Sequence, residues 1–246
     1  MSYCSGELSF LPQVENLQYT INRYFNTLEK HNSSEQCSIS ANALDTISRE
    51  WKTILLGWHD DHVMQNFEFH GHLLDGIKKL IRTIMKEQLL QTSFNRGRDY
   101  RSLLETLLVQ LPDNIESLGM LRGLSTNAAV VKACGRDSHV RISYLLKSIP
   151  EQNKKLLQSL NQIQELYPDL SSLQTLKKLQ RKLHEFLFSI QMNILDSPEI
   201  SENSTRLFDL STSIIDTHWF AMEQGIEAID KLLYINFDQA DRLAGS

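Results

Sequence analysis

The sequence predicts an all-α protein made of up-and-down helical bundles. Apolar residues recur at spacings of three and four along most of the chain, which is the period of an amphipathic helix. Only 10 glycines and 5 prolines interrupt the 246 residues, so the segments between them are long enough for helices. The pattern contains no pair of alternating segments joined by a hairpin turn signal. We therefore expect two packed four-helix-type bundles.

The first part of the chain carries two long helical patterns and two polar loops. A first helix is expected over residues 11–30, followed by the loop His31–Ser40. A second pattern runs from Ala41 to about Leu90, and three glycines mark places where it can kink or break: Gly57, Gly71 and Gly76. The polar segment Gln91–Gly97 then divides a single all-helical domain, residues 1–246, into sub-bundles of about 1–97 and 98–246.

The rest of the chain contains five further helical patterns. They cover Asp99–Leu111, Pro112 to about Gly135, residues 137–166, residues 170–195, and a last helix that starts between Ser201 and Thr205 and reaches about Tyr234. Pro112 suits the first turn of a helix, where its missing N–H group costs nothing. Asp196-Ser197-Pro198 predicts a turn before the last helix.

Composition excludes several classes of function. The chain is 41% apolar and 22% charged, as in ordinary globular proteins, and its net charge of −5 argues against a nucleic-acid partner. Three separated cysteines without a Cys-x-x-Cys pair favour a reducing compartment and argue against a structural zinc site. Neither a secretory signal nor a membrane span is predicted, so we expect a cytoplasmic protein. Because nucleophile-elbow, P-loop and dinucleotide motifs are absent, we expect neither an enzyme nor a cofactor.

Arg122 stands out because it interrupts a stripe of apolar and small residues. The stripe follows helical spacing and consists of Leu111, Ile115, Leu118, Arg122, Ser125 and Ala129. A buried guanidinium needs a carboxylate, backbone carbonyls or a bound anion, and its planar fork suits an oxyanion. Gly123 would allow close approach of a second backbone, and Ser125 adds a hydroxyl. The alternatives are an ion pair with a neighbouring helix and a side chain that reaches solvent from the edge of the stripe.

Two stretches resemble the nitrate- and nitrite-sensing (NIT) domain family. RGLSTNAAVVKACG, residues 122–135, resembles the first family signature, in which an Arg-Gly-x-Ser step precedes an apolar run and a glycine-containing break. DSPEISENSTRLFDLSTSII, residues 196–215, resembles the turn before the later signature helix. The resemblance covers roughly residues 110–235. It implies two opposed helical bundles, a small nitrate- or nitrite-like anion bound near Arg122, Gly123 and Ser125, and regulation of an output domain.

His218 is the fourth candidate ligand-binding residue. It lies on the apolar face of the last helix, about one turn before the position of the family's second arginine. A histidinium there would help to hold an anion, whereas a neutral histidine bonded to a backbone carbonyl would belong to the core. The family's Gln-Glu-Arg-Ala step is replaced by Trp219-Phe220-Ala221-Met222, which favours an alternative: a ligand-free helical protein–protein interaction module. In both cases we expect a protein partner or a homodimer.

Histidines are concentrated in a second segment, between Trp58 and His72. In one continuous helix His59, His62, Asn66 and His70 would lie on the same side. His59 and His62 are close enough to share an ion, but His70 is about 12 Å farther along the axis. We predict a buried polar seam or a contact surface for a partner here, and no metal site.

Overall fold

The structure is a computed structural model of the whole chain, and it describes residues 11–32, 40–57, 63–86, 97–166 and 172–244. All regular elements in these ranges are helical and none is a strand, which confirms the predicted all-α class. Within the same ranges, no helix is both long and apolar enough to cross a membrane. The chain divides into two compact units, Met1–Phe94 and Asn95–Ser246.

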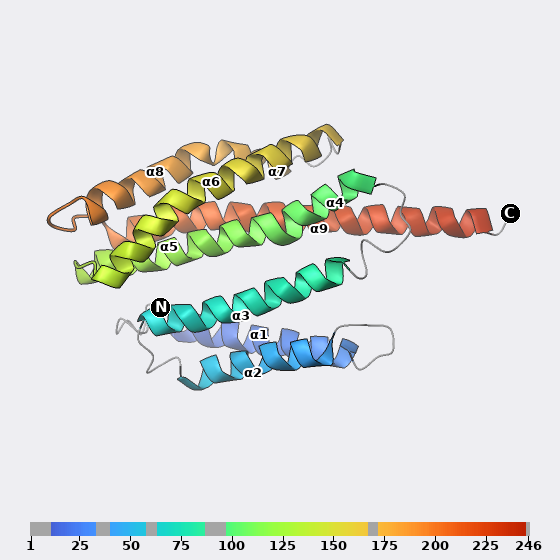
Figure 1. Cartoon of the computed structure of the whole chain (residues 1–246), viewed down its shortest axis with the longest axis horizontal. Coiled ribbons are helices and arrows are strands. Elements are labelled where there is room, and N and C mark those ends of the chain that lie inside the picture. Colours follow the sequence, from blue (N-terminus) through green and yellow to red (C-terminus); the bar gives the residue numbers. More distant parts are fainter. Residues whose placement is uncertain (1–10, 33–39, 58–62, 87–96, 167–171, 245–246) are drawn as a thin grey trace. The chain divides into compact units, whose positions relative to one another are not determined.

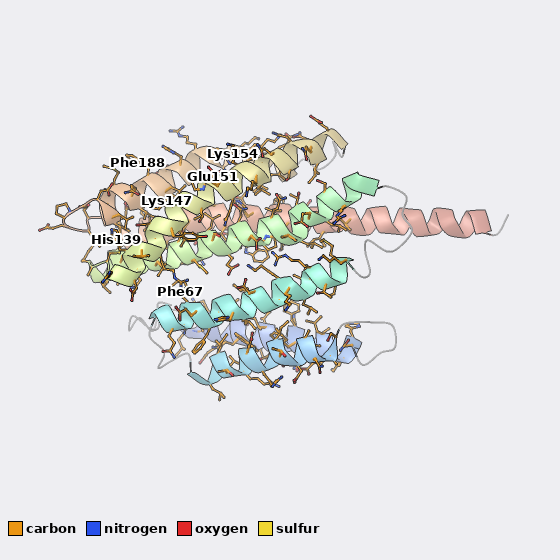
Figure 2. All side chains as sticks on the ribbon, viewed as in Figure 1. Phe67, His139, Lys147, Glu151, Lys154 and Phe188 are labelled. Carbon is orange, nitrogen blue, oxygen red and sulfur yellow. The ribbon has the colours of Figure 1, made fainter. Side chains whose placement is uncertain are left out.

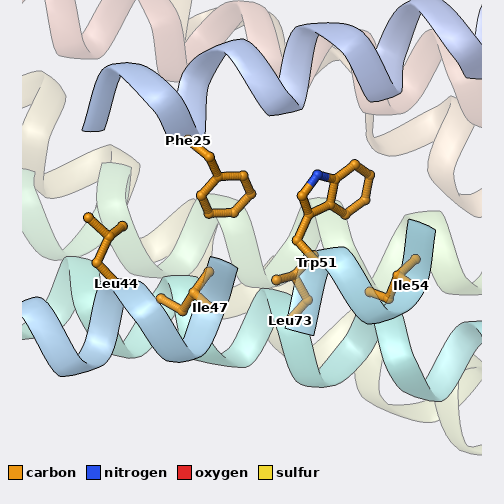
Figure 3. Close-up of a cluster of buried hydrophobic side chains, with 6 residues drawn as sticks. All are labelled: Phe25, Leu44, Ile47, Trp51, Ile54 and Leu73. Atoms are coloured by element: carbon orange, nitrogen blue, oxygen red, sulfur yellow. The ribbon is translucent and has the colours of Figure 1, made fainter. Parts of the chain in front are cut away.

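The first unit contains helices α1 (Leu11–Asn32), α2 (Ala41–Gly57) and α3 (Val63–Ile84) (Figure 1). Gly57 is the last residue of α2, while Gly71 and Gly76 lie inside α3. The described part of this unit therefore has three helices and not the four that we expected. Figure 3 shows its core, in which six buried side chains from all three helices meet: Phe25, Leu44, Ile47, Trp51, Ile54 and Leu73.

The second unit is built from four long helical segments. The first consists of α4 (Gly97–Glu105), η4 (Thr106–Gln110) and α5 (Leu111–Val131), and the second is α6 (Arg136–Leu166) (Figure 1). The third consists of α7 (Ser172–Lys178), α8 (Gln180–Ile190) and η5 (Gln191–Leu195), and the fourth is α9 (Ser204–Ala244). The helix α5 packs against α6 and most extensively against α9, α6 packs against α7, and α7 and α8 pack against α9. These contacts have the neighbour order of an up-and-down four-helix bundle.

Two boundaries in this unit differ from the prediction. Pro112 lies in the first turn of α5, as predicted, but the helix before it does not end: η4 is a π-helical turn, in which the Leu111 N–H bonds to the Thr106 carbonyl, so the chain stays helical from Gly97 to Val131. A proline cannot donate the next backbone bond, and such a local widening accommodates it. The helix α5 ends at Val131 and not near Gly135, and it is capped by Lys132, whose φ of 54° is left-handed. The last helix continues beyond Tyr234 to Ala244.

Gly225 allows α9 to approach η4 closely. A Cβ atom at Gly225 would lie 2.4 and 2.6 Å from the two methyl carbons of Leu107, a side chain that is fully buried. Gly119 on α5 is different, because a Cβ there would meet nothing within 4 Å. The two glycines therefore have opposite packing requirements although both lie inside helices.

We predict that Gly225→Ala destabilises the protein and that Gly119→Ala does not. Overpacking against Leu107 costs about 1–3 kcal/mol, which exceeds the gain of up to about 1 kcal/mol from the helix propensity of alanine. At Gly119 only that gain applies. Urea unfolding of both variants measures the difference. Equal stability of the two variants would show that α9 does not pack on Leu107 as described.

Candidate functional site

The Arg122 stripe on α5 lies where the sequence places it. Its apolar and small members are all buried: Leu111, Ile115, Leu118, Ser125 and Ala129. Arg122 is partly exposed and lies on the side of α5 that faces α9. The stripe is therefore a core face with one charged residue at its edge.

The guanidinium of Arg122 is held by two side chains of α9. Its Nη1 donates a hydrogen bond of 3.0 Å to the Thr212 hydroxyl. Its Cζ atom lies 5.0 Å from the centre of the Phe208 ring, within the range of a cation–π contact. Phe208 and Thr212 are one helical turn apart, so both contacts come from the same face of α9.

No carboxylate in the described part of the chain lies within ion-pair distance of this guanidinium. Burial lowers the pKa of Arg122, and the more distant negative charge of Asp216 raises it in part. An arginine with a lowered pKa still carries its charge at neutral pH. A half-buried positive charge is thus balanced only by a hydroxyl, an aromatic ring and an exposed carboxylate farther along α9.

The neighbours Gly123 and Ser125 are both buried in α5. The Ser125 hydroxyl lies 2.6 Å from the Leu121 carbonyl oxygen and 3.2 Å from that of Arg122. Its hydrogen is therefore used within its own helix. A role of Gly123 or Ser125 in ligand binding stays a prediction.

His218 lies in the core of the second unit. It is 3% exposed, and its Nδ1 lies 2.8 Å from the Ile214 carbonyl oxygen, which can only accept a hydrogen bond. Burial lowers the pKa of His218, and the bond to Ile214 opposes this only in part, so a neutral ring is favoured. Thr212, which binds Arg122, lies six residues earlier, or about 120° around α9 and 9 Å along it. His218 and the Arg122 contacts thus occupy different faces of α9.

Sequence reasoning missed a polar cluster around the buried carboxylate of Glu202, which we call the Glu202 cluster: Glu185, Ser189, Asn193, Glu202 and Arg206. The Glu202 carboxylate accepts hydrogen bonds from the Ser189 hydroxyl, from Asn193 Nδ2 at 2.7 Å and from Arg206 Nη1 at 3.1 Å. Arg206 also pairs with Glu185 at 2.8 Å. The only signal in the sequence was the spacing of four between Glu202 and Arg206, beside the helix-capping residue Asn203.

The Glu202 cluster fixes the start of α9. Through it, the loop before α9 is bonded to α8 and η5, and Lys132 at the end of α5 adds a 2.9 Å bond to the Glu202 carbonyl. Burial alone would raise the pKa of Glu202, but the bonds from Ser189, Asn193 and Arg206 outweigh it and lower that pKa. Because both carboxylate oxygens are bonded, the cluster is structural.

Only part of the predicted histidine seam lies in the residues that the structure describes. His59 and His62 are outside the described residues. Asn66 is buried, and its carbonyl lies 2.8 Å from His70 Nδ1. In the described ranges, no three histidine, cysteine or acidic side chains are grouped so that they could hold a metal ion.

Comparisons with protein-family models, with curated proteins and with solved structures gave no match to this chain. The evidence for a function of this site is therefore its own geometry. In the described residues that geometry places an unpaired guanidinium between α5 and α9, and it places His218 on a separate face.

We predict that His218 titrates below 6.5, the ordinary value of a histidine. Since the folded-state pKa is lowered, His218 contributes stability above pH 6.5 that is lost as the pH falls through the folded pKa. NMR titration of the ring gives the pKa directly. A His218 pKa above 6.5 would contradict the prediction and would indicate a charged, ligand-holding histidine.

We predict that Glu202→Gln lowers the free energy of unfolding at pH 7 by about 2–3 kcal/mol, because hydrogen bonds to a buried charged group are lost. Since the pKa of Glu202 is lowered in the folded state, its contribution is present above about pH 4.3 and is lost as the pH falls through the folded pKa. Urea unfolding of both proteins between pH 3 and 7 tests this. Glu199→Gln, at an exposed carboxylate in the same loop, is the control. Parallel stability curves for wild type and Glu202→Gln would contradict the assignment.

Proposed function

We propose that this chain is a ligand-sensing, regulatory helical domain that binds a small anion at Arg122. One observation carries the proposal: a half-buried guanidinium lies between α5 and α9 without a carboxylate at ion-pair distance in the described part of the chain. Charged groups in such positions are usually paired, and an external anion is the partner that would complete the site. The NIT-like residues Arg122, Gly123 and Ser125 support the same class of ligand.

The charges at Arg122 and Asp216 determine which anions the site would bind, and the position of Arg122 determines how binding would affect the helices. One guanidinium with Asp216 nearby favours a singly charged anion over a dianion, because each further negative charge is repelled by that carboxylate. The anion would add bonds to a residue of α5 that already contacts α9. It would therefore favour whichever packing of these two helices gives it the better contacts. That shift is the signal for a protein partner or a second copy.

The alternative is a ligand-free interaction module, and exposed aromatic residues favour it. Trp219 and Phe220, at the place of the family's polar step, are 43% and 49% exposed on α9. Phe188 on α8, labelled in Figure 2, is 57% exposed. Exposed aromatic side chains of this kind are enriched at protein interfaces. Light scattering at micromolar concentration separates a 28.4 kDa monomer from a dimer.

We predict that a monovalent anion stabilises the wild-type protein and that Arg122→Ala abolishes the response. Thermal unfolding is measured in sodium nitrate, nitrite, formate and sulfate at constant ionic strength. At a hundred times the dissociation constant, stabilisation is about 2.7 kcal/mol, or roughly 5–10 °C. Sulfate should give the weakest response.

Two further variants sharpen this experiment. Arg122→Lys keeps the charge but loses the planar fork, so the response should be weaker. Arg181→Ala removes an exposed arginine of α8 and should leave the response intact. Without anion, Arg122→Ala should cost no more than about 1 kcal/mol, because the loss of the contacts with Phe208 and Thr212 is offset by the removal of a partly desolvated charge. A wild-type protein that responds to none of these anions would refute the sensing function at this site.

A further inference from the structure

Thr126 carries a polar group that the fold does not use. It lies one helical turn after Arg122 on α5, and its hydroxyl oxygen is buried without a hydrogen-bond partner in the described part of the chain. Threonines inside helices usually donate to the carbonyl four residues earlier. Among the described residues, the following threonines do so: Thr20, Thr27, Thr46, Thr53, Thr83, Thr106 and Thr217.

The carbonyl that Thr126 would use belongs to Arg122. That oxygen is instead contacted by the Ser125 hydroxyl at 3.2 Å. A buried hydroxyl without a partner is unfavourable, so a native protein with such a group needs a reason to keep it. A ligand that supplies the missing partner is such a reason.

The position of Thr126 relates it to Arg122 and α9. Residues four apart on a helix share a face, so Thr126 lies on the same side of α5 as Arg122. The Arg122–Thr212 bond and the Gly225–Leu107 contact show that α5 and α9 run antiparallel. The turn after Arg122 therefore faces the turn before Thr212, which carries Phe208. We call these four residues the Arg122 seam: Arg122, Thr126, Phe208 and Thr212.

We propose that Thr126 is a second ligand-binding residue of this site and donates its hydroxyl hydrogen to the bound anion. The inference rests on the proposed anion-sensing function. The Thr212 hydroxyl accepts a bond from Arg122, which leaves its own hydrogen to donate. The seam thus offers a guanidinium and two hydroxyl donors, a set that matches the acceptor oxygens of a small oxyanion.

Ligand binding at Thr126 requires the seam to open. The Thr126 hydroxyl oxygen is covered, and the guanidinium of Arg122 lies over the Phe208 ring. An anion that contacts both donors must displace the ring or separate α5 from α9. Binding of the anion would then be coupled to a movement of Phe208 or α9, and this movement would transmit the signal.

The test compares threonine variants in titrations with sodium nitrate and sodium formate. Thr126→Val removes the hydroxyl at nearly constant shape and should weaken binding about tenfold. Thr126→Ser keeps the hydroxyl and should bind within about threefold of wild type. Thr217→Val is the matched control, because it removes a helical threonine hydroxyl of α9 that is bonded to the Ser213 carbonyl. It should leave anion binding unchanged.

Urea unfolding without anion provides a second readout. Because the Thr126 hydroxyl has no partner in the described residues, Thr126→Val should be as stable as wild type or more stable. A loss of stability would show that the hydroxyl has a structural role and would overturn the inference.

The outcomes separate this inference from the proposed function. If wild type responds to an anion, Arg122→Ala abolishes the response and Thr126→Val leaves it unchanged, the inference about Thr126 is wrong while the anion site stands. If wild type responds to neither salt, the proposed function fails and the inference fails with it. Weakened binding in Thr126→Val, with binding kept in Thr126→Ser and Thr217→Val, supports both.

Discussion

The second unit depends on the packing of α9 along α5. At one end of this contact, Gly225 lets α9 approach Leu107 more closely than any side chain would permit. At the other end, the Glu202 cluster bonds the start of α9 to α8 and η5, and Lys132, which caps α5, bonds to the Glu202 carbonyl. Phe208 and Thr212 lie between these two anchors, so their positions beside Arg122 follow from the way in which both ends are held.

This arrangement explains why Arg122 keeps its charge without an ion pair at the edge of a core face. Burial acts against the guanidinium, while a ring face, one hydroxyl and the distant Asp216 favour it. The buried charge of Glu202 is stabilised differently, because hydrogen-bond donors contact both oxygens of its carboxylate. Among the described residues of this unit, the Glu202 carboxylate therefore has donors on both oxygens, whereas the half-buried Arg122 guanidinium has no ion pair, and it is at Arg122 that we propose the anion site.

The periodicity of the sequence predicted most of the helices, and for α5 and α9 it also predicted the buried face. The stripe around Arg122 and the apolar face around His218 both lie in the core, as their spacing indicates. The helix break expected before Pro112 and the helix end expected near Gly135 were wrong, because a π-helical turn and a left-handed lysine depend on contacts that local sequence does not show. The partners of Arg122 lie some ninety residues away on α9, and no spacing rule relates positions in different helices. For the same reason, the sequence alone could not predict the Glu202 cluster or the unpaired hydroxyl of Thr126.

The π-helical turn η4 sets the rotational phase between α4 and α5. A π turn holds one residue more than an α-helical turn, so the helix before it is rotated by about 100° relative to an uninterrupted α-helix. Leu103 and Leu104 lie in α4, directly ahead of η4, and are fully buried. The extra residue in η4 turns them toward the core. A single-residue deletion in Thr106–Gln110 would restore regular α-helix and turn this face outward. Homologous chains that share this core should therefore tolerate length changes in their loops but keep the residue count of this segment.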